Sequence, residues 1–390
     1  MPWRTATVER ERARFAIEAE LSELSHAELC RRYGISRRTG YKWIQRYQEE
    51  GVEGLRDRSH RPRSCPHATS DLVVERILEL RRRYDWGSRK IRRKLCDDPE
   101  IDDVPSPYTI TRVLRRHGCI EPRKPRRKRT HPGPPLPFEP EPNATWTADF
   151  KGEFRTRDGR LCYPLTIQDG HTRFLLECRA MHRLSMEATQ RSFTRVFRSF
   201  GLPRRIRTDN GHPFASTAIA GLSQLSIWWI SLGILPEYIE PGKPQQNGRH
   251  ERMHRTLKKR TASPPRANIR AQQRRFNEFR GVYNSERPHE ALDMETPASV
   301  YEPSPRPFVE RPVSPSYPDY FETRIVSGDS TLRWKSRKVF VSSLLKYRSV
   351  GLEQIGDGVW AVYFGPVHLG WLDEADYRIM DVKDRARRRR

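Results

Sequence analysis

The sequence predicts a multidomain protein with all-α helix-turn-helix units at the N-terminus, a central α/β domain and a small β-barrel at the C-terminus. Capped helical segments fill the first 120 residues, and β-rich runs alternate with a helix between residues 143 and 300. Short strands with Gly-Asp and Gly-Pro turns fill residues 320 to 380. A chain of 390 residues has room for two to four such domains.

A first helix-turn-helix unit is expected within residues 1 to 58. Ser25 can cap one helix and Ser36 a second, with a turn at Gly34 between them. The start of the second helix is where such a unit contacts base edges. Its basic and hydroxyl groups favour DNA binding over the alternative, a purely structural helical hairpin. The residues expected to contact DNA are Arg37, Arg38, Thr39, Tyr41 and Lys42.

A second helical unit is expected within residues 70 to 120, after a proline-containing linker. Helices are predicted over 72–84, from about 86 to 95 and over 108–117. We expect this unit to bind DNA as well, and the alternative is that it serves only for protein contacts. Its candidate DNA contacts are Arg89, Lys90, Thr109 and Arg112. The basic, proline-rich residues 121–142 that follow are expected to form an extended linker.

The central domain starts with a predicted three-stranded antiparallel meander. Its β-rich runs lie before Asp149, over 161–167 and over 173–178. The acids between them, Asp158 and Asp169, each precede a glycine and are interpreted as turn residues.

A helix from about Ser185 to Phe200 follows the meander, because apolar residues recur there at helical spacing. The chain then resumes as a short strand over 204–207, with Asp209 at its end. This order places Asp149 and Asp209 on strands that can be neighbours.

Three carboxylates, Asp149, Asp209 and Glu251, stand in distinctive contexts: Trp-Thr-Ala-Asp-Phe, Thr-Asp-Asn-Gly and Asn-Gly-Arg-His-Glu. Hard oxygen ligands of this kind hold Mg²⁺, which keeps waters and phosphate oxygens in its remaining positions. Two such ions roughly 3.5–4 Å apart activate the attacking oxygen and stabilise the leaving oxygen in phosphodiester chemistry. We therefore expect the three acids to be catalytic, metal-binding residues. The alternative is that they are ordinary surface carboxylates.

A basic helix is predicted directly after Gly248, which ends a polar loop. Positions 251, 254, 255 and 258 share one of its faces by helical spacing. Glu251 is therefore expected to bind metal, while His254, Arg255 and Lys258 face a nucleic-acid backbone.

At these residues the chain resembles the integrase-core (DDE) transposases of bacterial insertion sequences, relatives of retroviral integrases. The resemblance covers roughly residues 140 to 300 and is carried by the motifs at 208–211, 241–248, 250–258 and 283–292. It implies a ribonuclease-H-like core, two Mg²⁺ ions per active site, which Mn²⁺ can replace, and the three acids as their ligands. It also implies cleavage at the ends of a mobile element, joining of the freed 3′ hydroxyl to target DNA, and a homo-oligomer that bridges both ends. The wide interval before Glu251 is interpreted as an inserted or extended helix around 218–231.

A rival chemistry is suggested by His250, Glu251 and His254, which fit the H-E-x-x-H pattern of zinc metallopeptidases. The flanking arginines and lysines would crowd a Zn²⁺ with positive charge, and no third ligand is clearly placed downstream. These flanks favour the DNA chemistry.

Composition indicates a nucleic-acid partner independently of any motif. The chain has 74 Lys+Arg against 49 Asp+Glu, a formal charge of +25, and the excess is spread along its whole length. No apolar run approaches the roughly 18 residues of a spanning helix, and the start does not have the pattern of a signal peptide, so no membrane partner is expected. Six cysteines without Cys-x-x-Cys spacing indicate reduced, buried thiols of a cytoplasmic protein, associated with the bacterial nucleoid if it acts on DNA.

The C-terminal strands are predicted around residues 321–326, 331–334, 338–341, 352–355, 359–363 and 368–372. Their aromatic residues favour barrel core over base-stacking platforms, and residues 381–390 are expected to be a solvated basic tail. The predicted protein is a DNA transposase that recognises terminal repeats of double-stranded DNA through residues 1 to 120. The alternative from another class is a helix-turn-helix DNA-binding regulator with an inert integrase-like core.

Overall fold

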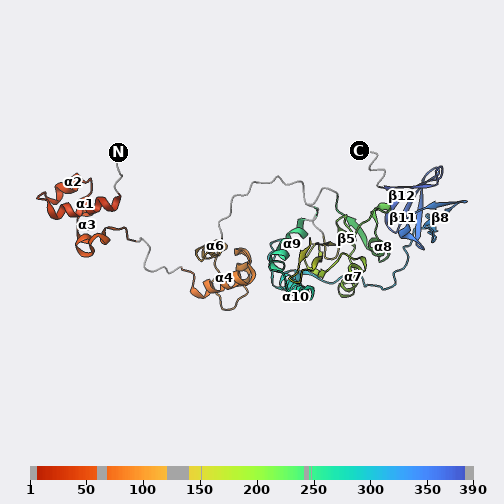
Figure 1. The fold of residues 1–390 in the computed structure, drawn as a ribbon, viewed down its shortest axis with the longest axis horizontal. Helices are drawn as coiled ribbons and strands as arrows, with labels where there is room; N and C mark the ends of the chain where they lie inside the picture. Colours follow the sequence, from red (N-terminus) through yellow and green to blue (C-terminus); the bar gives the residue numbers. More distant parts are fainter. Residues whose placement is uncertain are drawn as a thin grey trace. The chain divides into compact units, whose positions relative to one another are not determined.

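A computed structural model of the chain describes residues 7–58, 68–120, 140–150, 152–240, 246 and 248–382. The chain divides into two compact units, Met1–Ser70 and Asp71–Arg390 (Figure 1). The expected linker at 121–142 and the expected basic tail lie almost wholly outside the described residues, as do most of the loop before Gly248 and residue Cys65.

The first unit contains three helices, α1 (Val8–Leu21), α2 (His26–Arg32) and α3 (Arg37–Glu50), followed by the 3-10 turn η1 (Gly51–Leu55). The predicted caps are confirmed, because Ser25 and Ser36 accept from backbone N–H groups of the first turn of α2 and α3. Helix α3 packs tightly at Gly40, where an added Cβ would lie 2.5 Å from Cys30 Sγ. The unit therefore has a small apolar core of its own, formed by Phe15, Leu29, Cys30, Trp43 and Leu55.

The second unit starts with α4 (Asp71–Tyr84), α5 (Ser88–Leu95) and α6 (Pro107–Arg116), as the sequence predicts. Ser106 caps α6, and Pro107 occupies its first turn, where the missing N–H is not needed. Apolar residues of all three helices, among them Ile77, Ile91 and Ile110, form one buried cluster.

The centre of the second unit is a six-stranded sheet. Its strands are β1 (Thr145–Phe150), β2 (Phe154–Arg155), β3 (Leu161–Asp169), β4 (Leu175–Met181), β5 (Arg205–Thr208) and β6 (Leu235–Tyr238). The order is β2-β3-β1-β5-β6, with β4 also paired to β3. The expected antiparallel meander is confirmed as β1, β3 and β4, whereas β5 joins β1 and β6 joins β5 in parallel. The centre of the sheet is thus β1, the strand that carries Asp149.

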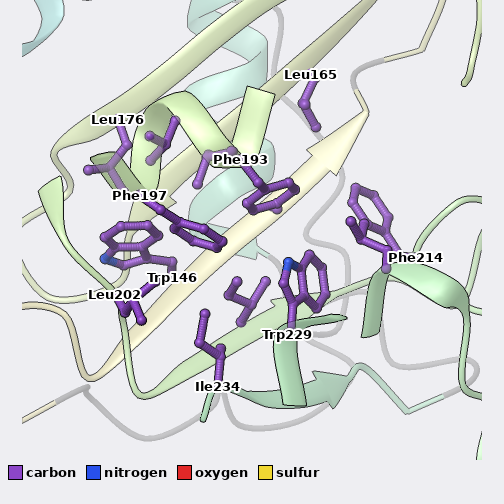
Figure 2. Close-up of a cluster of buried hydrophobic side chains, with 14 of the residues drawn as sticks. Trp146, Leu165, Leu176, Phe193, Phe197, Leu202, Phe214, Trp229 and Ile234 are labelled. Atoms are coloured by element: carbon purple, nitrogen blue, oxygen red, sulfur yellow. The ribbon is translucent and has the colours of Figure 1, made fainter. Parts of the chain in front are cut away.

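Helices cover both faces of this sheet. Trp146 of β1 packs with Phe193 and Phe197 of α7 (Met186–Phe200) and Trp229 of α8 (Gln224–Ser231) on one face (Figure 2). On the other face, α9 (Gly248–Thr261) and α10 (Ile269–Gly281) pack against residues of β3 and β4. The chain continues through the turns η4 (Val282–Glu286) and η5 (Glu290–Leu292) and the short helix α11 (Pro297–Val300).

Helix α8 fills the segment interpreted from the sequence as an extra helix. It is apolar on two sides, because Leu225 and Trp229 enter the core of the central sheet while Ile227 and Ile230 enter the core of the C-terminal strands. With the preceding turn η2 (Ile219–Gly221), it therefore joins the two domains of the second unit.

The C-terminal strands are β7 (Glu322–Ile325), β8 (Thr331–Trp334), β9 (Arg337–Phe340), β10 (Ser349–Gly356), β11 (Val359–Phe364), β12 (Val367–Asp373) and β13 (Arg378–Asp381), with the turn η6 (Ser343–Leu345) after β9. The expected barrel is not confirmed. The strands form an open antiparallel sheet in the order β13-β12-β11-β10-β7 and a separate β8-β9 pair. Trp334 is buried, in line with a core role, while Trp360, Tyr363 and Trp371 are half-buried.

The described cysteines are free thiols. Cys30, Cys162 and Cys178 are buried as expected, whereas Cys119 is half-buried and Cys96 is exposed.

Candidate active site

Asp149 and Asp209 lie at the same end of neighbouring parallel strands. The register of β1 and β5 pairs Trp146 with Ile206 and Thr147 with Arg207. Asp149 and Asp209 are each two positions beyond the last of these pairs. Since side chains two positions apart point to one face of a strand, both carboxylates belong to the face that carries Thr147. The predicted neighbourhood of the two strands is confirmed.

A tight turn fixes the carboxylate of Asp209. The Gly211 N–H donates to Asp209 Oδ1 at 3.1 Å, and Asn210 Nδ2 donates to the Ile239 carbonyl at 2.8 Å. A Cβ at position 211 would lie 3.2 Å from Asp209 Oδ2, closer than most Cβ contacts. The Asp-Asn-Gly sequence therefore holds this acid directly after the strand end.

Two buried histidines of α9 fasten this helix to β1 and β3. His250 and His254 are 1% and 3% exposed. His250 Nδ1 lies 2.8 Å from Thr147 Oγ1, and its Nε2 lies 2.7 Å from Thr166 Oγ1. His254 Nε2 lies 2.6 Å from the same Thr166 hydroxyl. Thr166 is the residue of β3 that pairs with Asp149, so the two imidazoles pack directly beside that acid.

The other edge of the His254 ring faces Asp149, with Nδ1 3.7 Å from Asp149 Oδ2. Among the described residues, Asp149, His250 and His254 form a group of side chains whose ligand atoms are close enough to share a metal ion. Burial lowers the pKa of His250 to about 3, so this imidazole is neutral at physiological pH. Neutral imidazole and a carboxylate are both metal ligands, so the donor chemistry around Asp149 fits a divalent cation.

Glu251 lies on a different side of α9 from the histidines. It is exposed and lines a hollow of about 530 Å³ together with Arg255, Lys258 and Lys259. The expected common face is therefore correct for Glu251, Arg255 and Lys258 but wrong for His254. Each residue turns a helix by about 100°, so position 254 is roughly 60° away from 251 and turns toward the sheet.

The zinc-peptidase interpretation gains no support from this arrangement. Both histidine rings are buried against threonine hydroxyls, and the glutamate between them is exposed on another side of the helix. A peptidase site needs an open metal position next to the glutamate.

The histidines as partners of Asp149 were missed by sequence reasoning. The signal that could have found them is the pair of threonines on the face of Asp149, because buried hydroxyls require hydrogen-bond partners. Asp158 is a turn residue, as predicted, whereas Asp169 is the buried last residue of β3, directly before the turn. Thr156 Oγ1 donates to Asp158 and lowers its pKa, while burial raises the pKa of Asp169, which accepts from Thr172.

The candidate DNA contacts of the first unit lie on the start of α3. Arg37, Arg38, Tyr41 and Lys42 are exposed, and Thr39 is half-buried beside the Ser36 cap. None of the four exposed side chains pairs with an acid in the part of the chain that the structure describes. This surface is available to a ligand.

The candidates of the second unit divide between two helices. Arg112 on α6 is exposed and Thr109 is half-buried. On α5, Arg89 forms an ion pair with Glu290 at 3.1 Å, and Lys90 Nζ donates to the Pro288 carbonyl at 2.6 Å. Burial lowers the pKa of Lys90 to about 8. Both candidate residues of α5, Arg89 and Lys90, therefore lie in a protein contact, which is the alternative that the sequence left open for this unit.

Family models match both the helical units expected to bind DNA and the central domain that carries the three acids. A helix-turn-helix domain matches residues 11–63 and a homeodomain-like domain matches residues 39–114. Two integrase core domains match residues 139–244 and 232–297. The central sheet with Asp149 and Asp209, and helix α9 with Glu251, lie within the integrase core matches.

Related proteins come from insertion elements. The chain is 27% identical over 250 residues to an uncharacterized 31.7 kDa protein of insertion element IS407 from Burkholderia multivorans, covering 60% of this chain and 82% of that protein. It is 31% identical over 159 residues to an uncharacterized 39.2 kDa protein of insertion element IS476 from Xanthomonas euvesicatoria, covering 40% and 44%. A chain in the structure of a simian T-cell lymphotropic virus intasome in complex with PP2A regulatory subunit B56 gamma is 15% identical, covering 75% of this chain and 97% of that one, with a TM-score of 0.38.

The resemblance to integrase-core transposases of insertion elements is confirmed by these family and sequence matches. The N-terminal matches add helix-turn-helix domains ahead of that core. Within the described part of the chain, no helix has both the length and the apolar character needed to cross a membrane.

Proposed function

We propose that this protein is a DNA transposase that cuts DNA at the ends of its own mobile element and joins the freed 3′ hydroxyl to target DNA. The observation that carries the proposal is the position of Asp149 and Asp209 at the ends of adjacent strands within an integrase core, with α9 packed against β1 and β3 beside Asp149. Asp149, Asp209 and Glu251 are the proposed catalytic acids.

Two Mg²⁺ ions are the proposed cofactors, with Mn²⁺ as a substitute. When bound, such ions activate the attacking oxygen and stabilise the leaving oxygen of a phosphodiester. The carboxylates of Asp149 and Asp209 suit them because each is fixed by its strand or turn and belongs to a half-buried residue. Glu251 is the proposed third ligand, although it lies on a different side of α9 from the histidines beside Asp149.

The chain's own cations would position the DNA. Arg255 and Lys258 share the hollow with Glu251, so their charges can hold backbone phosphates near the reacting bond. The exposed start of α3, and Thr109 and Arg112 of α6, are the proposed contacts with the terminal repeats. Arg89 and Lys90 can join them only where they leave their contacts with Glu290 and Pro288.

A homo-oligomer assembled on two element ends is part of the proposal, as is a place in the bacterial cytoplasm next to the nucleoid. Both follow from the kind of reaction, in which one assembly must handle two DNA ends and a target. Free thiols at the described cysteines agree with a reducing compartment.

The experiment compares Asp149→Asn, Asp209→Asn and Glu251→Gln with Asp158→Asn, a matched acid in an exposed turn of the same domain. Each of the first three removes one ligand charge from a nearly isosteric side chain, so cleavage of element-end DNA should be lost while end binding stays. Asp158→Asn should cleave normally. Normal cleavage by any of the first three would remove that residue from the site, and binding without cleavage by the wild type would point to a DNA-binding regulator.

A further inference from the structure

His254 occupies a position from which it can add a nitrogen ligand to the acid site. Its Nδ1 lies 3.7 Å from Asp149 Oδ2, on the face of the sheet where Asp209 also ends its strand. Metal–ligand bonds of about 2.0–2.2 Å place two ligands of one ion about 2.9–3.5 Å apart. A shift of a few tenths of an ångström in either side chain would bring these two atoms into one coordination shell.

The hydrogen bonds of Thr166 favour the tautomer that such a ligand needs. One hydroxyl hydrogen is available, and Thr166 Oγ1 is near three groups: Nε2 of His250, Nε2 of His254 and the backbone carbonyl of Asp149. If that hydrogen points to His250 or to the carbonyl, His254 must bring its own hydrogen on Nε2. A neutral imidazole protonated at Nε2 presents the lone pair of Nδ1 toward Asp149.

The opposite tautomer would place an N–H on Nδ1, directed at the carboxylate. A separation of 3.7 Å is too long for that hydrogen bond. Metal-binding histidines usually donate their second N–H to a neighbouring acceptor, which fixes the ring. Thr166 supplies such an acceptor at 2.6 Å.

His250 differs from His254 in what its ring nitrogens face. Both of its nitrogens face hydroxyls, Nδ1 toward Thr147 at 2.8 Å and Nε2 toward Thr166 at 2.7 Å. It is therefore a positioning residue that holds the Thr166 hydroxyl beside His254, and it provides a matched control on the same helix.

We propose that His254 Nδ1 is a direct ligand of the ion bound by Asp149, which gives this site a mixed nitrogen and oxygen donor set. Mg²⁺ prefers oxygen ligands, whereas imidazole suits transition ions. The nitrogen ligand should therefore raise the affinity for Mn²⁺ and Co²⁺ relative to Mg²⁺ above the ratio of a site made of carboxylates alone. The inference rests on the proposed metal-dependent function.

The test uses the full chain without DNA and Mn²⁺ as the probe. Pulsed electron paramagnetic resonance should detect coupling of bound Mn²⁺ to an imidazole nitrogen in the wild type. This coupling should be lost in His254→Asn and in Asp149→Asn and retained in His250→Asn. Calorimetry should show Mn²⁺ affinity falling about tenfold or more for His254→Asn, with a much smaller change for Mg²⁺.

A wild type without nitrogen coupling, or coupling that survives His254→Asn, overturns the proposal. Circular dichroism checks that each variant is folded, and a wild-type spectrum without nitrogen coupling overturns the proposal even if His254→Asn does not fold. The outcome is separable from the proposed function, because loss of cleavage in Asp149→Asn, Asp209→Asn and Glu251→Gln does not depend on a nitrogen ligand.

Discussion

The two N-terminal helical units carry similar basic helices but differ in what those helices meet. In the first unit, the basic start of α3 is exposed. In the second, three basic residues of α5 contact the integrase core: Arg89 pairs with Glu290, Arg93 pairs with Glu295, and Lys90 donates to the Pro288 carbonyl. Basic charge on a short helix therefore does not distinguish a DNA partner from a protein partner; the position of acidic residues elsewhere in the chain does.

The contact of the second unit with the core uses the motif at 283–292, which the integrase resemblance had singled out. Glu286 accepts from Tyr84 and lies 3.8 Å from Arg83, and Lys259 of α9 pairs with Asp85 at the end of α4. Val282 also packs against the apolar cluster of α4–α6. This motif has a structural explanation: it holds a helical unit against the core near the helix that carries Glu251.

For the first unit, Arg38→Ala should cause the largest loss of DNA affinity. An exposed arginine on the recognition helix can make a bidentate base contact, worth about 1–3 kcal/mol. The loss should appear for the element's own terminal repeat and be small for unrelated DNA. Quantitative binding assays at fixed salt measure both, with Gln48→Ala, exposed near the other end of α3, as the control. An equal loss on all sequences would make Arg38 a phosphate contact.

For the second helical unit, Lys90→Met should weaken the contact between α5 and the core. The change leaves the Pro288 carbonyl without its donor, which costs about 1–3 kcal/mol for a buried group and less for a partly exposed one. Hydrogen exchange should become faster over residues 283–295. Arg92→Ala, exposed on the same helix, is the control and should leave exchange unchanged. If Lys90→Met instead reduces DNA binding and leaves hydrogen exchange normal, α5 contacts DNA, as is expected of α3.

A smaller effect is expected from Lys258→Ala, which removes a cation from the hollow beside Glu251. One lost phosphate contact should weaken DNA binding on all sequences and lower the slope of log affinity against log salt by roughly 0.9. Lys259 pairs with Asp85, so Lys259→Ala should change this slope less. Equal slopes for wild type and Lys258→Ala would assign Lys258 to a solvated face.

The smallest effect should be a pH dependence of the α5 contact. Burial lowers the pKa of Lys90 to about 8, below its ordinary value, so the docked state binds fewer protons than the open state between those pH values. The contact should therefore become more stable as pH rises from about 8 to 10.5. Hydrogen exchange over 283–295, corrected for its intrinsic pH dependence, measures this. Lys90→Met should remove this rise in stability with pH. A rise that persists in the variant would show that another group titrates.

Local signals in the sequence predicted much of the fold. Serine caps gave the starts of α2, α3 and α6, and the alternation of strands gave β1, β3, β4 and β5. The same local logic put Asp149 and Asp209 on neighbouring strands. It also identified Glu251, Arg255 and Lys258 as one face, because that face depends only on helical spacing.

Features that depend on distant partners could not be predicted in this way. The burial of His254 depends on Thr166, 88 positions away, and the pairing of Arg89 depends on Glu290, 201 positions away. The prediction of a C-terminal barrel was not confirmed for a related reason. The sequence pattern predicts where strands form, but the closure of a barrel depends on which edge strands pair with each other. In this sheet β13 and β7 remain unpaired with each other and form its two edges.

The central claim is that the acids at the strand ends bind the ions that act on DNA, and Asp209→Cys tests it most directly. A thiolate binds Mg²⁺ poorly but accepts softer ions such as Mn²⁺ and Cd²⁺. Cleavage of element-end DNA should be lost with Mg²⁺ and return in part with Mn²⁺ or Cd²⁺, while Asp158→Cys should cleave with Mg²⁺ as the wild type does. Wild-type cleavage by Asp209→Cys with Mg²⁺, or equal loss with every ion, would contradict metal binding by Asp209.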